Sequence, residues 1–143
     1  MAFERIIKRL TSLNIPQIIR TTLRPSLGLI ADLQREQLFA GIDSFGEPII
    51  PEYSTDTIRR KGKKSPRQPT DRVTLKDTGK FYKGIKGEIK DQKITVTSRD
   101  LKTEMLKGKY GDKILGLTDE NIALVLERAR QPLIQRIQKI LLS

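Results

Sequence analysis

The 143-residue chain contains no cysteine, no histidine and no tryptophan. Without cysteine it can form no disulfide and has no thiolate nucleophile, and without either cysteine or histidine it can build no Cys/His zinc site. The lack of histidine also removes the side chain that most often acts as a general base near neutral pH. An enzyme with this composition would depend on carboxylates, lysines and hydroxyls, so we expect no catalytic residue, no bound metal and no cofactor.

Long hydrophobic runs are also missing. The apolar runs are only a few residues long, against the roughly 20 that would span a bilayer. The first ten residues carry charges at Glu4, Arg5, Lys8 and Arg9, which break up the apolar segment that a signal peptide needs. We therefore expect a soluble protein that is not secreted by that route and has no membrane partner. The length is typical of a single domain, here residues 1–143.

Positive charge is abundant, and it is concentrated in one region. The formal net charge is +11, and residues 57–113 hold 18 of the 28 Lys and Arg but only 7 of the 17 Asp and Glu. This region therefore carries the whole excess, and the rest of the chain is neutral. Such a field attracts polyanions, namely nucleic acid, an anionic surface or an acidic protein.

Helical patterns mark both ends of the chain. Apolar residues at helical spacing begin at Phe3, and the sequence Asn14–Pro16 predicts that one helix stops and a second begins. A longer helix is expected from Ser26, as N-cap, to about Ala40. The terminal helix is expected to begin after the cap Thr118, and Pro132 inside its pattern should kink or split it.

A β-hairpin is predicted between these helical regions. Ile85–Lys90 alternates apolar and charged residues, Ile94–Thr97 is rich in β-formers, and Asp91-Gln92 forms a tight connection between them. The order of elements gives an α+β fold with N-terminal helices, a small antiparallel sheet or hairpin, and a long C-terminal helix.

A basic stretch precedes the hairpin. Prolines, glycine and like charges predict an exposed basic loop over about residues 59–70. Its cations are Arg59, Arg60, Lys61, Lys63, Lys64 and Arg67. They could contact DNA phosphates without reading sequence, or dock on an acidic partner protein. The charge pattern leaves both possibilities open, and a solvated loop is the plainest interpretation.

Two short motifs suggest chemistry. Asp77-Thr78-Gly79 matches the aspartic-protease tripeptide, but Lys76 stands where that site needs an apolar strand, so a capped turn is favoured. Asp77 followed by Glu88-x-Lys90 resembles a metal-dependent nuclease pattern, in which two carboxylates hold Mg²⁺. Charged residues on alternate positions are also what a half-exposed hairpin displays, and this interpretation is the default.

The layout as a whole resembles a family. Leu75, Asp77, Thr78 and Gly79, then a hairpin, then Tyr110-Gly111 and the Leu115-Gly116-Leu117 turn before a terminal helix resemble the virion-morphogenesis and tail-completion proteins of tailed bacteriophages. The upstream segments around Gln37–Gly41 and Pro51–Ser54 are similar too. The usual His-x-x-Gly of the family is replaced here by Lys109-Tyr110-Gly111.

This resemblance implies a structural protein of the virion neck or tail that assembles as a homo-oligomeric ring at the head–tail junction. Its partners would be other neck, tail or portal proteins, and the basic loop would face DNA or an acidic neighbour. The motif residues would define the fold. The alternatives are a free, non-specific nucleic-acid-binding protein and, third, the metal-dependent nuclease.

Overall fold

A computed structural model describes residues 2–64, 68–90 and 93–143. The longer helices are α1 (Ala2–Ser12), α2 (Ile15–Leu23), α3 (Leu27–Phe39) and α7 (Asp119–Leu142), and the 3-10 turn η1 (Arg24–Ser26) joins α2 to α3. The shorter elements are α4 (Thr55–Gly62), α5 (Lys80–Gly84), α6 (Thr103–Tyr110) and the 3-10 turn η2 (Asp112–Ile114). Strands β1 (Ile85–Lys90) and β2 (Lys93–Ser98) pair in antiparallel fashion. The expected α+β class, with its long C-terminal helix, is confirmed.

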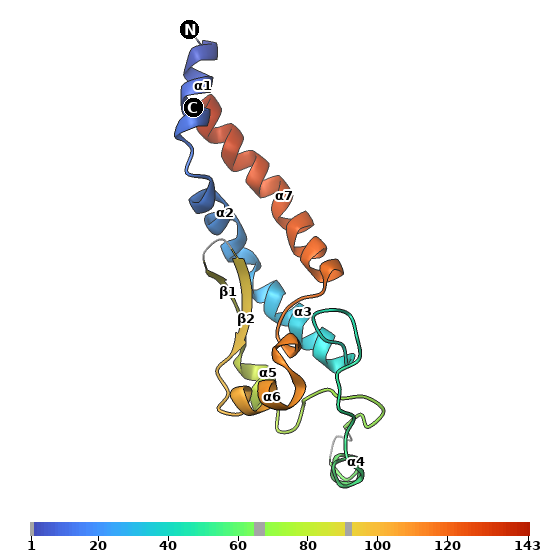
Figure 1. The fold of residues 1–143 in the computed structure, drawn as a ribbon. Helices are drawn as coiled ribbons and strands as arrows, with labels where there is room; N and C mark the ends of the chain where they lie inside the picture. The colour runs from blue at the N-terminus through green and yellow to red at the C-terminus, as the bar shows by residue number, and fades with distance from the viewer. Residues whose placement is uncertain (1, 65–67, 91–92) are drawn as a thin grey trace.

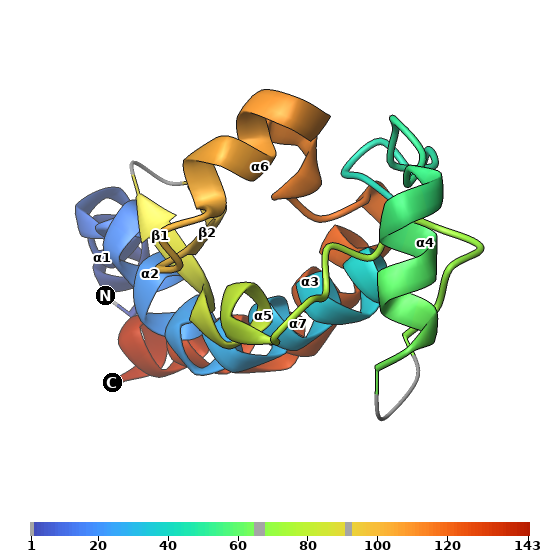
Figure 2. The same ribbon diagram turned by 90° about the horizontal axis from the view of Figure 1, so that it is seen from below.

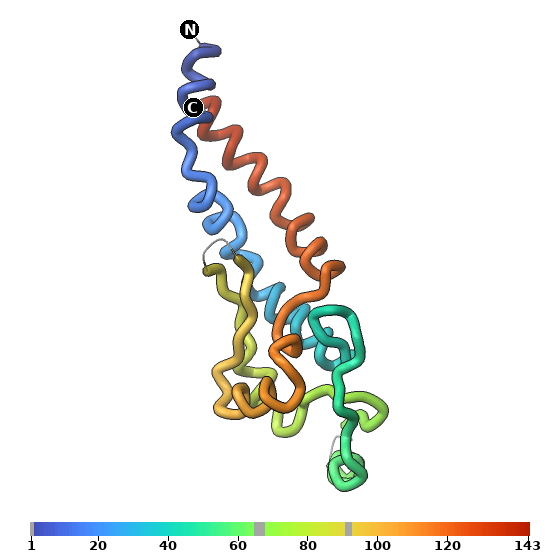
Figure 3. Tube along the Cα trace, viewed as in Figure 1, coloured from blue at the N-terminus to red at the C-terminus, as the bar shows by residue number. Residues whose placement is uncertain are grey.

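These elements form an elongated arm and a rounder body. The arm consists of α1 and α2, which follow one another, and of α7, which runs alongside both and brings the two ends of the chain to one tip (Figure 1). The trace of α1, α2 and α3 follows one long path from this tip down into the body (Figure 3). Viewed from below, α4, α5 and α6 surround the lower end of the molecule (Figure 2). At the tip, the Arg9 guanidinium donates to the carbonyls of Ile140 and Leu141 at 3.4 and 3.3 Å, where a cation suits the helix dipole.

Helix starts follow the capping residues in the sequence. Asn14, Ser54 and Thr118 each accept a hydrogen bond from the backbone amide three residues on, at 3.2–3.3 Å. Ser26 makes no capping bond, because η1 carries the chain in helical backbone from α2 into α3. Pro132 does not split α7, which runs through it as one helix. Because the proline nitrogen carries no hydrogen, α7 lacks the one backbone hydrogen bond that residue 132 would otherwise donate.

The hairpin packs against α3 through its apolar face. Gly87 pairs with Val96 in the register, and a Cβ built on Gly87 would lie 2.9 Å from Cγ2 of Ile30. Only glycine allows the strand to approach the helix this closely. Ile85 is buried on the same face, as the alternating pattern predicts. The predicted connection Asp91-Gln92 lies outside the described residues.

The expected basic loop over 59–70 is in part helical. Arg59, Arg60 and Lys61 form the last turn of α4, which continues past Ile58 to Gly62. The physical reason is visible in the sequence: Asp56 lies in the first turn and the three cations in the last, which complements the helix dipole at both ends. Arg67 lies outside the described residues.

Candidate interaction surfaces

The Leu115–Leu117 motif is held by two buried glutamines of α3. Gln34 accepts a hydrogen bond from the Gly116 amide at 2.7 Å. Gln37 donates to the Gly116 carbonyl at 2.8 Å and accepts from the Thr118 amide at 3.0 Å. We call this arrangement of Gln34 and Gln37 around the turn the glutamine clasp. It satisfies backbone groups of the turn that leads into α7, so the motif is engaged inside the body.

Leu75 lies in an unusual backbone conformation that two tyrosines support. Its φ is +60°, a left-handed value that a branched side chain seldom adopts. The Tyr53 hydroxyl accepts the amides of Thr74 and Leu75, both at 2.9 Å, and the Tyr82 hydroxyl donates to the Thr74 carbonyl at 2.6 Å. Burial raises the pKa of Tyr82 above its ordinary range, so it remains a donor. The two tyrosine hydroxyls therefore hold the backbone at the motif residue Leu75 in this conformation.

Asp77 is engaged by two lysines. Lys64, at the end of the α4 segment, donates to Oδ1 of Asp77, and the Lys102 ammonium lies 3.8 Å from Oδ2. The hydrogen bond from Lys64 is the main cause of a lowered pKa for this carboxyl. Thr78 accepts from the Lys80 amide at 3.4 Å, and Gly79, with φ of +89°, begins α5. The tripeptide is thus a turn that leads into a helix, as the turn interpretation expects.

Glu88, the second carboxylate of the nuclease-like pattern, lies on β1 between two lysines. Lys86 and Lys90 lie 2.7 and 3.6 Å from its two carboxylate oxygens. The first of these bonds is the main cause of a lowered pKa for Glu88. Among the described residues there is no group of three or more Asp, Glu, His or Cys side chains that could hold a metal ion. The strand therefore displays paired charges on its outer face.

The cations of the basic segment differ in their burial and in their partners. Lys61 is buried, donates to the Lys76 carbonyl at 2.5 Å and lies over the Tyr53 ring, 4.9 Å from its centroid. Arg59 is exposed and lies 3.9 Å from Asp56 one helical turn earlier. The Lys63 side chain is exposed as well. One of these predicted partner-facing residues, Lys61, therefore serves the protein's own packing.

A basic cleft of about 200 Å³ opens between α4, α5 and α6. Its apolar floor includes the buried aromatic rings of Phe81 and Tyr110, and the exposed Met105 side chain lines its edge. Around this floor stand five cations against two carboxylates, Asp77 and Asp100. The cations are Arg60, Lys61, Lys64, Lys102 and Lys109. The cleft therefore combines an apolar surface with a surplus of positive charge.

The motif residue Tyr110 lines one wall of this cleft, and the motif residue Gly111 follows it. Tyr110 is buried at the end of α6, and the Lys109 ammonium lies 5.3 Å from its ring centroid. Gly111, with φ of +93°, ends the helix and begins η2. A side chain with a Cβ would be strained there, which explains the glycine.

The arm exposes much of its apolar surface. None of the described side chains of α1 is buried, and α7 buries only Val125 and Ala129. Phe3 on α1 is 72% exposed, and Leu126 on α7 is 53% exposed. The arm as described here therefore covers little of its own hydrophobic surface.

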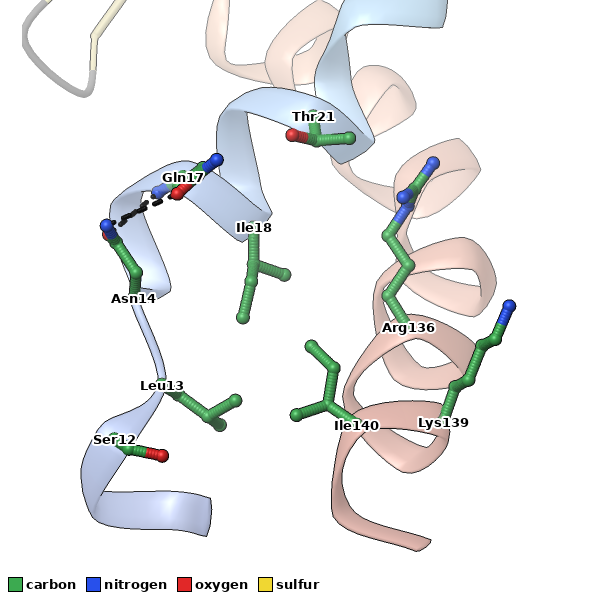
Figure 4. Close-up of a pocket in the computed structure, with 9 residues that line it drawn as sticks. All are labelled: Ser12, Leu13, Asn14, Gln17, Ile18, Thr21, Arg136, Lys139 and Ile140. Atoms are coloured by element: carbon green, nitrogen blue, oxygen red, sulfur yellow. Dashed lines mark hydrogen bonds between the residues drawn. The ribbon is translucent and has the colours of Figure 1, made fainter. Parts of the chain in front are cut away.

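A groove of about 420 Å³ runs between α2 and the end of α7. Figure 4 shows the side chains of Leu13 and Ile18 pointing toward Ile140 across it, while the charged ends of Arg136 and Lys139 point away. The groove between the two sides of the arm thus has three apolar side chains at its centre, and polar or charged residues line the rest of it. Apolar side chains left in an open groove can be covered by another protein.

Several functional residues were missed by reasoning from the sequence. Gln34 and Gln37 look like solvent-facing residues of a helix, and no local signal indicates their partners. Lys102 was not singled out, and Lys109 was named only for its place before Tyr110, although both lie within the basic region that the charge count identified. Phe45, whose side chain is 78% exposed, was not singled out either.

Comparisons with protein-family models, with curated proteins and with solved structures give no match for this chain. In the part of the chain that the structure describes, no helix is both long enough and apolar enough to cross a membrane.

Proposed function

We propose that this chain is a structural component of a tailed-phage virion, a neck or tail-completion protein that assembles as a ring at the head–tail junction. The observation that carries the proposal is the arm, whose α1 and α7 leave large apolar side chains such as Phe3 and Leu126 in solvent. Burying apolar surface yields roughly 25 cal/mol per Å², so these side chains favour association. The family resemblance supplies the place in the virion.

A ring needs a contact in which two different surfaces of identical subunits meet. Such head-to-tail contacts close into rings when the rotation between subunits permits it. The molecule offers different surfaces at its two ends, an apolar arm and a basic body. In the proposed ring, the arm packs on a neighbouring subunit or on a neck, tail or portal protein. Exposed cations such as Arg59 and Lys63 then face packaged DNA or an acidic neighbour.

The ring is tested by native mass spectrometry and negative-stain microscopy of the purified chain. We expect closed rings for the natural chain and loss of rings in the arm variants Phe3→Asp and Leu126→Asp, because a charge in the contact opposes burial. Lys83→Asp is the control on the body, since Lys83 is exposed on α5, does not line the basic cleft and should leave assembly intact. A chain that stays monomeric at every concentration, alone and with isolated tails, would contradict the proposal.

The place in the virion needs its own test. In particles of the phage that encodes the chain, gold-labelled antibody should mark the neck, and particles lacking the chain should have unjoined heads and tails. Label spread over the capsid, or normal particles without the chain, would refute the assignment.

A second candidate, a free nucleic-acid-binding protein, is favoured by the exposed cations of α4 and α6. It predicts that the monomer binds duplex DNA and that affinity falls steeply with salt, by about one power of salt concentration for each phosphate contact. A DNA-binding isotherm measured across a salt series on the Leu126→Asp monomer separates the two candidates. Weak binding at physiological salt favours the ring.

A further inference from the structure

The loop at Asp43–Pro48 is a rigid turn that displays an aromatic side chain. The fully buried Asp43 carboxylate accepts the amides of Phe45 and Glu47 at 2.9 and 3.1 Å. The Ser44 amide donates to the Lys113 carbonyl at 2.8 Å, and Gly46 turns the chain with φ of +80°. The backbone of the loop is therefore fixed from inside, which keeps the position of its tip well defined.

At this fixed tip, Phe45 is 78% exposed. A large aromatic side chain gains by leaving water, and a rigid loop that presents one to solvent resembles the anchor residue of a protein interface. The exposed side chains that follow it are apolar or acidic, namely Glu47, Pro48, Ile50 and Glu52. The two nearby cations are half-buried: Lys113 lies 3.5 Å from the buried Asp43 carboxylate, and Arg72 lines a hollow with Pro48 and Glu52. We call this surface the acidic knob. It carries no cation between Glu47 and Glu52.

The basic cleft has the complementary character. Its floor is aromatic and aliphatic, and its rim holds the exposed cations Arg60, Lys102 and Lys109. Lys64 and Lys102 converge on Asp77, which shows that the cleft accommodates a carboxylate between them. Phosphates of duplex DNA would use the cations but would leave the apolar floor without a partner. An apolar side chain flanked by carboxylates would use both.

We propose that Phe45 of one copy of this chain inserts into the basic cleft of the next copy, with Glu47 and Glu52 facing the rim cations Arg60, Lys102 and Lys109. The inference rests on the proposed ring and adds a contact between the bodies of its subunits to the one proposed for the arm. Knob and cleft are different surfaces of the same chain, so the contact is of the head-to-tail kind that rings require. Opposite charge at the rim fixes the register, and the aromatic anchor is the main source of affinity.

The natural absence of cysteine makes this contact directly measurable by disulfide trapping. Pro48→Cys places one thiol beside the knob while keeping Phe45 and both glutamates, and Met105→Cys places the other on the cleft. Two copies of different tagged mass, one with each substitution, are mixed under mild oxidation and resolved on a denaturing gel. We expect a mixed cross-linked dimer at least tenfold above that of Pro48→Cys with Leu142→Cys, a control at the arm tip, where Leu142 is 73% exposed.

Adding Phe45→Ala to the Pro48→Cys copy should reduce the mixed dimer at least fivefold, and Lys102→Glu with Lys109→Glu in the Met105→Cys copy should do the same. A dimer yield equal to that of the Leu142 control, or a yield that Phe45→Ala does not change, overturns the inference. If rings still form in that case, the proposed function stands. A strong Phe45-dependent cross-link supports the contact, whether or not rings close. Loss of the cross-link on adding duplex DNA, with no response to Phe45→Ala, would assign the cleft to DNA instead.

Discussion

The arm and the body of this molecule are built on opposite principles. The body buries an apolar core that includes Ile30, Leu38 and Ile114. Polar bonds between buried groups add to it, since fully buried Gln34 and the buried Gln37 satisfy the backbone of a distant turn. The arm is held by a few contacts between exposed helices, and in its α7 only Val125 and Ala129 are buried. The body therefore buries many of its own groups, whereas the arm leaves large apolar side chains in solvent. Under the proposed function, a neighbouring subunit or virion protein would cover that surface.

The largest expected effect tests the body. Gln37→Leu keeps the approximate size of the side chain and leaves the Gly116 carbonyl and the Thr118 amide without partners in a buried place. At about 1–3 kcal/mol for each unsatisfied group, the free energy of unfolding should fall by about 3 kcal/mol. Urea denaturation measures it. The adjacent Glu36→Gln, on the exposed side of α3, should change stability by less than about 0.5 kcal/mol.

The second effect tests the contact between the hairpin and α3. Gly87→Ala forces a Cβ within 2.9 Å of Ile30 and within 3.2 Å of the Leu27 carbonyl, so the strand must move away. We expect a loss of about 2 kcal/mol in thermal or urea unfolding. Gly28→Ala in α3 is the opposite case, since nothing lies within 4 Å of its added Cβ. That variant should gain about 0.5–1 kcal/mol, and equal losses in the two variants would speak against the close approach.

The third effect lies at the junction of arm and body. Thr118 caps α7 through its bond to the Asn121 amide at 3.3 Å, and Thr118→Ala should cost about 1 kcal/mol. Thr118→Ser, which keeps the hydroxyl, should recover most of it. Hydrogen exchange should show the loss in the first turn of α7. A loss confined to the tip of the arm would contradict the capping role.

The smallest effect concerns pH. The ion pair with Lys64 lowers the folded-state pKa of Asp77, so its contribution to stability is complete above the ordinary carboxyl pKa and is lost as the pH falls through the folded-state value. The carboxylate is half-exposed, and such pairs contribute about 0.5 kcal/mol. Asp77→Asn should therefore be slightly less stable than the natural chain at pH 7 and equal to it near pH 2. The urea midpoints of the two proteins at the two pH values measure this difference in stability. A difference that is the same at pH 7 and pH 2 would show that the ion pair is not its cause.

Local signals in the sequence predict the elements well. Thr118 caps the terminal helix as expected, a second helix starts after Asn14, and the alternation from Ile85 to Lys90 forms a strand, whereas the cap expected at Ser26 is absent. These features depend on neighbours within a few residues, which a linear sequence contains. The prediction of a loop from residue 59 was wrong at its start. It rested on the prolines and like charges and left out the helix dipole, which favours cations in the last turn of a helix, so α4 extends into the predicted loop.

Long-range features could not be predicted in this way. A glutamine on a helix is usually solvated, and nothing near Gln34 or Gln37 indicates that each meets a turn about 80 residues away. The burial of Lys61 against Tyr53 and the Lys76 carbonyl depends on tertiary contacts too. The cleft itself is an assembly of separate segments, so the charge count found its region but not its shape. The place of the chain in a virion stays a prediction.

The glutamine clasp also constrains the order in which the molecule can fold. The Gln34 amide bonds the Ile114 carbonyl 80 residues along the chain, so α3 and the turn before α7 must meet before either is satisfied. Closing a loop of this length costs only about 0.6 kcal/mol more than closing one half as long, so stability suffers little. The folding rate is reduced more, because non-local contacts slow folding relative to a simple helical bundle. During synthesis the apolar faces of the N-terminal helices therefore stay exposed until the last third of the chain has left the ribosome.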